Sequence, residues 1–170
     1  RKLYAGDPAA GYIYFDLASP TTIRLGGLLP ADFDGLNPPA DAPAFFVGYT
    51  ATEYGDAADA IRIFEFRADF ADPQASSFTE RPESPIQTAP FDPTSPDGRA
   101  DILQPAPGEA LDAQSDRLMY RASYRNFGGR DSLVLNQTVR VSPAGQPFRA
   151  GVRVYELRRD ILFTPPSAPF

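Results

Sequence analysis

Apolar and polar residues alternate most regularly in the C-terminal third of the chain. Within residues 117–125, one face carries Leu118, Tyr120, Ala122 and Tyr124, and most of the residues between them are polar. A period of two is that of a β-strand that buries one face. We therefore expect a strand here, with both tyrosine rings in the core and their hydroxyl groups reaching polar partners.

The same alternation returns twice before the chain ends. Residues 132–141 place four apolar side chains on one face, namely Leu133, Leu135, Val139 and Val141. Residues 151–158 follow the same period, and here we expect Val152 and Val154 to point inward. Glycine and proline mark turns in the two intervening segments, 126–131 and 142–150. The three segments therefore predict an antiparallel meander with short connections.

Upstream, aromatic and β-branched residues gather in four stretches that we also expect to be strands. These stretches are 12–17, 21–29, 44–52 and 60–70. In the last stretch, isoleucines lie on one parity and Phe64 and Phe66 on the other, so both faces are apolar. That pattern indicates a central strand, or a strand with a bulge near Ile63 and Phe64.

Nineteen prolines and thirteen glycines interrupt the chain and leave little room for helices. Residues 71–98 hold six prolines, so we expect a loop there, with one short edge pairing at Ile86. A short helical turn is expected only at 108–117. The strand spacing predicts an all-β fold built from antiparallel meanders, either a propeller or a β-sandwich. We take residues 1–163 as one all-β domain or propeller segment and 164–170 as an extended proline-rich tail.

Composition narrows the chemistry that the chain can perform. It contains no cysteine and no histidine, which removes disulfides, thiolate or imidazole metal sites, and catalytic triads that use either residue. A carboxylate-based hydrolase and an oxygen-ligated calcium site stay open. The formal net charge of −6 gives no basic footprint for nucleic acid. No apolar run is long enough to span a membrane.

One acidic stretch resembles a calcium loop. Asp32 and Asp34 occupy alternate positions before Gly35, and Asn37 follows closely. Oxygen ligands at alternate positions suit calcium, and glycine permits a tight turn. The spacing of an EF-hand is absent, so we favour a polar turn whose aspartates accept hydrogen bonds from backbone amides. Calcium is the single cofactor that the sequence leaves open.

Three further groups of residues are candidate contacts for a ligand, a metal or a partner: a basic row, a pair of prolines and an acidic loop. Arg121, Arg125 and Arg130 form a basic row that suits a carboxylate or a sulfated sugar, and cross-strand pairing with acidic residues is the simpler interpretation. Pro165 and Pro166 in the tail are expected to lie on a partner protein. An acidic loop offers metal ligands or a carboxylate pair for glycan chemistry, and a solvated loop is the simpler interpretation for Glu53, Asp56 and Asp59.

Three segments carry a resemblance to a known family: 116–128, 131–139 and 151–158. They are similar to a long motif of large exported bacterial β-propeller-like proteins, most of which have no assigned function. Shorter pieces fit the same order upstream, at 29–35, 38–46, 60–66, 71–73 and 76–79. The resemblance implies a propeller-like fold with three or four blades, or a partial propeller, at roughly forty residues per blade. A β-sandwich is the alternative.

These features together favour a protein without enzymatic activity that is exported from a bacterial cell. We expect a scaffold or binding module that docks to other proteins, as an accessory subunit of an extracytoplasmic assembly. The chain begins with Arg1, which we interpret as a processed or excised piece. The alternatives are a carbohydrate-binding or carboxylate-based glycan-active module and a calcium-dependent adhesion module.

Overall fold

The computed structural model describes residues 2–17, 27–38, 42–96 and 99–160. Eight strands make up the regular structure, and they are β1 (Leu29–Gly35), β2 (Ala44–Thr50), β3 (Ala60–Arg67), β4 (Ser77–Glu80), β5 (Ile86–Gln87), β6 (Leu118–Asn126), β7 (Arg130–Arg140) and β8 (Ala150–Asp160). The helical elements of the described residues are three short 3-10 turns, η1 (Leu3–Ala5), η2 (Thr52–Tyr54) and η3 (Pro73–Ala75). The all-β class predicted from the sequence is confirmed.

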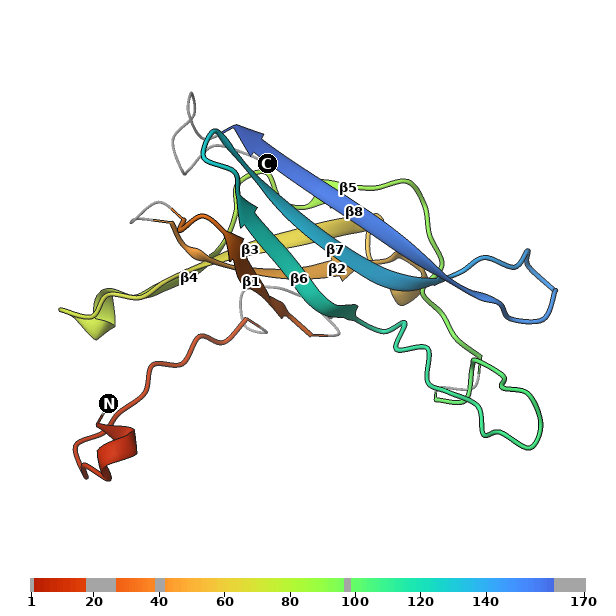
Figure 1. Ribbon diagram of the computed structural model, residues 1–170, viewed down its shortest axis with the longest axis horizontal. Helices are drawn as coiled ribbons and strands as arrows, with labels where there is room; N and C mark the ends of the chain where they lie inside the picture. The colour runs from red at the N-terminus through yellow and green to blue at the C-terminus, as the bar shows by residue number, and fades with distance from the viewer. Residues whose placement is uncertain (1, 18–26, 39–41, 97–98, 161–170) are drawn as a thin grey trace.

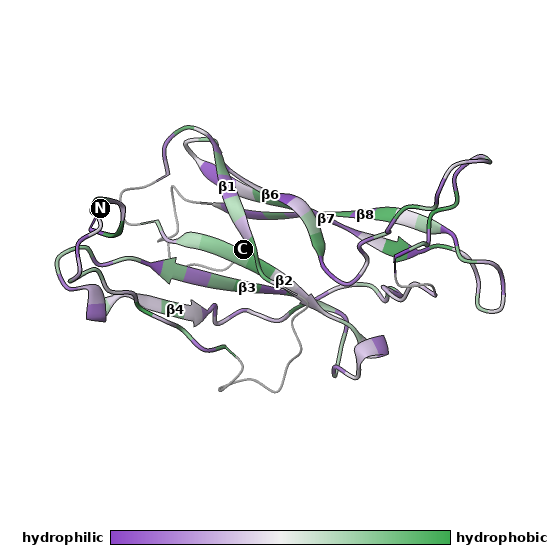
Figure 2. Cartoon of the chain, turned by 90° about the horizontal axis from the view of Figure 1, so that it is seen from below, coloured by the Kyte–Doolittle hydropathy of each residue, from purple (hydrophilic) through white to green (hydrophobic). Residues whose placement is uncertain are grey.

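The strands form one mixed sheet in the order β4-β3-β2-β1-β6-β7-β8, with β5 beside β3. The sheet curls strongly into a half-barrel, which is consistent with a propeller-like or partial β-fold. Figure 1 shows β6, β7 and β8 crossing in front of β2 and β3, and Figure 2 shows the two layers from the side. The β6-β7-β8 meander is antiparallel as expected, and β2, β3 and β4 form a second antiparallel meander whose last strand the sequence did not predict.

Strand β1 joins the two layers, which the sequence did not predict. Its first residues, Leu29 and Pro30, pair antiparallel with β2, whereas Ala31 to Gly35 pair in parallel with β6. A parallel pair needs a long crossover connection, because both strands run in the same direction. Here the connection consists of β2 to β5 and the loops up to residue 117. The acidic stretch predicted to be a turn is therefore a strand.

The hydrophobic core lies between the two layers. The β2-β3 layer supplies Phe45, Val47, Ile61 and Ile63, and the β6-β7 layer supplies Ala122, Tyr124, Leu133 and Leu135. The rings of Phe45 and Tyr124 meet across the layers with their centroids 5.4 Å apart. Burying one such aromatic or aliphatic side chain contributes about 1.5–3 kcal/mol to the free energy of unfolding. The alternation in 117–125 and 132–141 therefore predicted the buried face correctly at Ala122, Tyr124, Leu133 and Leu135.

Strand β3 lies between β2 and β4 and is buried on both faces, as its sequence indicates. One face points into the core, and the other carries Phe64 beside Arg62. The Arg62 guanidinium pairs with the carboxylate of Glu80, which also accepts a hydrogen bond from the Ser84 hydroxyl at 2.5 Å. These polar contacts allow a basic side chain to be buried on the outer face of the sheet.

Several expected elements differ from the structure. Residues 12–17 form no strand: the exposed fractions of Tyr12 and Tyr14 are 91% and 74%. Residues 108–117 form no helix: the segment is mostly irregular, with a turn only at 115–116, and Leu111 pairs with Ile102 in a short antiparallel bridge. The loop at 71–98 contains β4 as well as the expected pairing at Ile86. Of the expected strand 21–29, residues 21–26 lie outside the described residues.

A bulge in β6 interrupts the predicted alternation. The pairing register with β7 changes between Met119 and Ser123, so extra residues of β6 stand out from the ladder. Tyr120, predicted to lie in the core, is therefore 78% exposed. The shift amounts to two residues, which returns Ala122 and Tyr124 to the buried face.

The buried face of β8 is opposite to the predicted one. Directly opposed residues of two strands point to the same side of the sheet. Leu133 and Leu135 of β7 are buried, and they oppose Leu157 and Tyr155 of β8. Val152 and Val154, which were expected inside, consequently lie on the outer face and are 69% and 63% exposed. Val141, also expected inside, follows β7 and is 54% exposed.

Candidate binding surface

Strand β8 is the last strand of the sheet order and the longest edge in the described part of the chain. It spans eleven residues, Ala150–Asp160, and β7 is the strand that it pairs with. In an edge strand, every second backbone N–H and C=O points away from the sheet. Natural proteins usually shorten, cover or charge such an edge, because it accepts a further strand. Strand β8 carries charged side chains, among them the exposed pair of Glu156 and Arg158, but Val152 and Val154 are also largely exposed on it.

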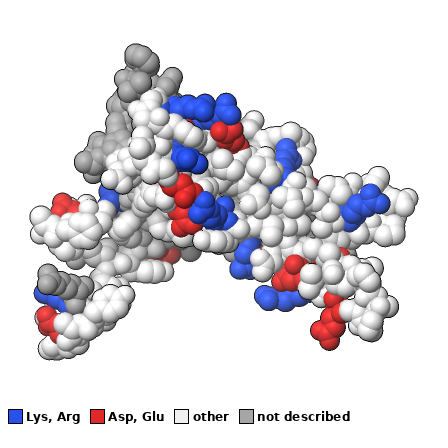
Figure 3. All heavy atoms as spheres, viewed as in Figure 1, with Lys and Arg blue, Asp and Glu red and all other residues white. Residues whose placement is uncertain are grey.

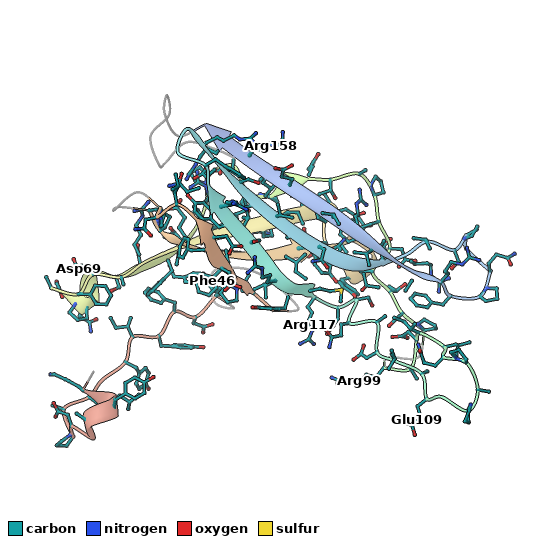
Figure 4. The ribbon with its side chains drawn as sticks, viewed as in Figure 1. Phe46, Asp69, Arg99, Glu109, Arg117 and Arg158 are labelled. Atoms are coloured by element: carbon teal, nitrogen blue, oxygen red, sulfur yellow. The ribbon has the colours of Figure 1, made fainter. Side chains whose placement is uncertain are left out.

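The outer face of β6, β7 and β8 changes in character along its length. Toward the 127–129 turn, Arg125, Ser132 and Arg158 lie opposite one another across the three strands. Arg158 stands at the outer end of β8 in Figure 4. Toward the 141–149 turn the surface becomes apolar through Val152 and Val154, and Figure 2 shows hydrophobic positions on this part of β8. The edge therefore has a charged end and an apolar end.

These three strands also concentrate basic charge. They carry seven arginines and three acidic residues, in a chain whose formal net charge is −6. Arg158 pairs with Glu156 at 2.6 Å, and both side chains are solvent-exposed. Acids from outside these strands compensate part of this charge, because Arg121 pairs with Asp34 and Arg140 with Asp92, and the remaining excess favours an acidic ligand or partner there.

Two of the predicted calcium ligands and one arginine of the predicted row meet on the outer face of β1 and β6. Asp34 pairs with the Arg121 guanidinium, and Asp32 lies 3.7 Å from the same group. The hydroxyl of Tyr120 donates to Asp32 at 3.1 Å, so the bulge brings both of its exposed side chains to the aspartates. Figure 3 shows acidic and basic atoms gathered over these strands. Cross-strand pairing, the simpler interpretation of the arginine row, holds for Arg121.

The Asp34 carboxylate is stabilised by a hydroxyl hydrogen-bond donor and two positive charges. The Ser123 hydroxyl donates a hydrogen bond to it at 2.6 Å. This bond, together with the positive charges of Arg121 and Arg125, holds the pKa of Asp34 below its ordinary value against the opposing effect of desolvation. The charged form is favoured in the folded chain, so this stabilisation is present above the unfolded pKa and is lost as the pH falls through the folded pKa.

We expect Ser123→Ala to raise the pKa of Asp34 toward 3.8, the value of an unperturbed aspartate. The physical reason is the loss of the hydroxyl donor that favours the charged form. The measurement is an NMR titration of the Asp34 side-chain carbonyl carbon. Ser142→Ala, in the turn at the far end of the meander, is the matched control. An unchanged Asp34 titration in Ser123→Ala would show that the hydroxyl does not support this carboxylate.

Arg125 and Arg130, the other two arginines of the predicted row, flank an aromatic ring, and Arg125 also lies opposite Asp34 across the β1–β6 pair. Their guanidinium carbons lie 5.2 and 5.0 Å from the centroid of Phe127. Such cation–π contacts hold two basic groups close together on the turn between β6 and β7. Gly128, with φ of +87°, gives this turn its left-handed residue. Pro165 and Pro166 lie outside the described residues.

Asn37 lies near the cluster without joining the two aspartates. Its backbone carbonyl accepts a hydrogen bond from the Asn126 side-chain amide at 2.6 Å. In the described residues, no three acidic side chains gather closely enough to hold a metal ion. A calcium site at Asp32, Asp34 and Asn37 stays a prediction, and the ion would have to displace Arg121 from the carboxylates.

The acidic loop is held together by its own backbone. Asp59 accepts hydrogen bonds from the amides of Thr52 and Phe91, each at 2.8 Å. Asp56 accepts a bond from the Ala51 amide at 2.9 Å, and Glu53 accepts one from the Thr52 hydroxyl at 3.2 Å. Burial raises the pKa of Asp59, and its hydrogen bonds outweigh that effect and hold the pKa below the ordinary value. These contacts are those of a structural loop.

Sequence reasoning missed a buried polar triad behind the outer face. The Tyr124 hydroxyl donates to Asp131 at 2.7 Å, and Arg159 donates to the two oxygens of the same carboxylate at 3.2 and 2.6 Å. Tyr124 and Asp131 are 0% exposed, and Arg159 is 4% exposed. Burial and the bond to Asp131 raise the pKa of Tyr124. The sequence signal for this triad is Arg159. It alternates with Leu157 along the strand and therefore lies on the same, buried face of β8.

No protein-family profile, curated protein or solved structure matches the chain. Within the described residues, no helix has the length and apolar character needed to cross a membrane. The site is therefore defined by the fold alone: an all-β half-barrel with a long edge strand, an outward apolar strip and a basic excess.

Proposed function

We propose that this chain is a binding module that docks to another protein through the edge of β8. The observation that carries the proposal is an eleven-residue edge strand whose outward valines, Val152 and Val154, are largely exposed. Strand addition at such an edge supplies backbone hydrogen bonds, and alternate side chains supply specificity. The composition supports a binding role over catalysis, because the chain lacks the histidine and cysteine of most nucleophilic sites.

The charge pattern indicates what the added strand contains. Its outward residues would lie beside Val152 and Val154 at one end and beside Arg158 at the other. Apolar residues suit the first two positions, and at the third a carboxylate would share the Arg158 guanidinium with Glu156, which pairs with it at 2.6 Å. The resemblance to exported bacterial proteins extends the proposal: the chain acts as an accessory subunit of an extracytoplasmic assembly, with a partner that offers an extended acidic segment.

The proposal is tested with a synthetic nine-residue peptide that alternates valine with threonine and ends in two glutamates. Calorimetry should detect its binding to the full chain. The same peptide with N-methyl groups on alternate amides should not bind, because it cannot donate to the sheet edge. A lysine-for-glutamate peptide should bind more weakly, and more so at low ionic strength. Equal binding of the parent and N-methylated peptides would contradict strand addition.

The protein side of the test uses two matched substitutions. Val154→Lys places a charge on the apolar end of the edge and should weaken peptide binding about tenfold or more, a loss of at least ~1.4 kcal/mol. Leu103→Lys changes an apolar side chain that is 85% exposed on a distant loop, and it should leave binding unchanged. If both variants bind like the unmodified chain, β8 is not the docking edge.

A further inference from the structure

The outer face of the β2-β3-β4 layer carries a second aromatic cluster, away from β8. Phe46, Phe64, Phe66 and Phe78 are cross-strand neighbours there, with the rings of Phe46 and Phe78 5.1 Å apart. A sheet with apolar side chains on both faces needs cover on both. On this face the cover comes from the N-terminal segment, whose Phe15 ring packs 6.2 Å from Phe66 and 6.0 Å from Phe78.

Among the described residues, this cover leaves a groove of about 700 Å³. Its aromatic walls come from Phe15, Phe46, Phe66 and Phe78, with Tyr12 and Ile13 on the N-terminal segment. Phe46 is the wall residue labelled in Figure 4. Residues 9–15 contribute one side of the groove and run as an extended chain in Figure 1, which corresponds to roughly 20 Å of length. Both size and shape suit an elongated small molecule.

The polar residues of the groove indicate the charge of that molecule. Lys2 is the single lysine of the whole chain, and it lines this groove. The remaining polar residues of the lining are Gln74 and Ser76, with Tyr12 as an amphipathic one. Among the described residues that line the groove there is no carboxylate, although the chain as a whole is acidic. One cation in the lining of an aromatic groove is complementary to one anion at the end of an apolar ligand.

We propose that this groove binds a free long-chain carboxylate, with the aliphatic chain against the four phenylalanines and the carboxylate beside Lys2. The apolar walls exclude water from the chain, and the ammonium group compensates the single charge. This site is independent of the β8 edge, since it lies on the other layer of the half-barrel. It would make the chain a carrier or sensor of an amphiphile in addition to any docking role.

Binding is tested with dodecanoate, which should displace the fluorescent anion 1-anilinonaphthalene-8-sulfonate from the full chain below the concentration at which dodecanoate forms micelles. Lys2→Gln should weaken dodecanoate binding about three- to fivefold and leave the neutral dodecan-1-ol unaffected. Phe15→Ala should weaken both ligands about tenfold. Leu111→Ala, at an exposed residue of a distant loop, is the control and should change neither.

Three outcomes would overturn the proposal. The first is failure of dodecanoate to displace the dye below its micelle concentration. The second is equal binding of dodecanoate to the unmodified chain, Lys2→Gln and Phe15→Ala. The third is self-association of the chain, measured by sedimentation, that persists when dodecanoate is added. The groove would then be covered by a second copy of the chain. Circular dichroism of each variant confirms that the fold is retained.

Discussion

Replacing Asp131 by alanine is expected to lower the free energy of unfolding by about 3–5 kcal/mol. The carboxylate is 0% exposed and receives hydrogen bonds from Arg159 and Tyr124. Without it, the Arg159 guanidinium stays buried against the Phe45 ring, whose centroid lies 5.7 Å away, and loses its carboxylate partner. A buried charge without its counter-ion costs far more than an exposed one. Chemical denaturation monitored by circular dichroism measures the effect.

Two further variants show whether the loss comes from the buried charge. Asp116→Ala breaks the exposed pair with Arg117 and should shift the denaturation midpoint only slightly. The double variant Asp131→Leu with Arg159→Met removes both charges and should recover most of the lost stability, since apolar residues of similar size replace such pairs well. If Asp131→Ala is no more destabilising than Asp116→Ala, the triad does not stabilise the fold.

The second large effect is expected for Phe45→Ala, which should also cost about 3–5 kcal/mol. Phe45 is 0% exposed and lies on β2, where it meets Tyr124 of β6 and the guanidinium of Arg159 of β8. Its ring therefore joins the two layers of the half-barrel. Removing it leaves a cavity that the surrounding strands can fill only in part. Urea denaturation gives the change in the free energy of unfolding.

Phe70→Ala is the matched control, because Phe70 is 93% exposed in the connection between β3 and β4 of the same meander. It should leave the midpoint unchanged within error. A Phe45→Ala variant as stable as Phe70→Ala would mean that the two layers do not share a core at this residue.

Local periodicity was sufficient to predict much of the fold. The strands β2, β3, β6, β7 and β8 lie where the sequence placed them, and the antiparallel meander β6-β7-β8 has the expected turns. Each of these strands buries a regular set of apolar residues, so the period of two was visible without tertiary information. The central position of β3 followed from its apolar residues on both faces.

The failures have a common physical cause: they depend on pairing register. Strand β1 pairs in parallel with β6, and the two are separated by most of the chain. The bulge at Tyr120 is set by the match between β6 and β7. The buried face of β8 follows from Leu133 and Leu135 on β7, because both parities of β8 mix apolar and charged residues.

The candidate site was likewise predicted only in part, and the missed part depends on how the strands pair. The sequence singled out Asp32, Asp34 and Arg121 but as two separate groups, the acids and the arginine. They come together only because β1 pairs in parallel with β6. The exposed edge of β8 was missed because Val152 and Val154 were assigned to the core. The aromatic groove was also missed, although the phenylalanines on the second face of β3 were visible in the sequence.

Hydrogen exchange of β8 tests the central claim, docking at its edge, most directly. In the isolated chain, the amides of Ala150–Asp160 should fall into two alternating sets, with the amides that bond to β7 exchanging slowly and the outward ones rapidly. Adding the valine–threonine–glutamate peptide should slow the rapid set and leave amides elsewhere unchanged. If the outward amides keep their rapid exchange while the peptide is bound, it binds elsewhere and the β8 edge is not the docking site.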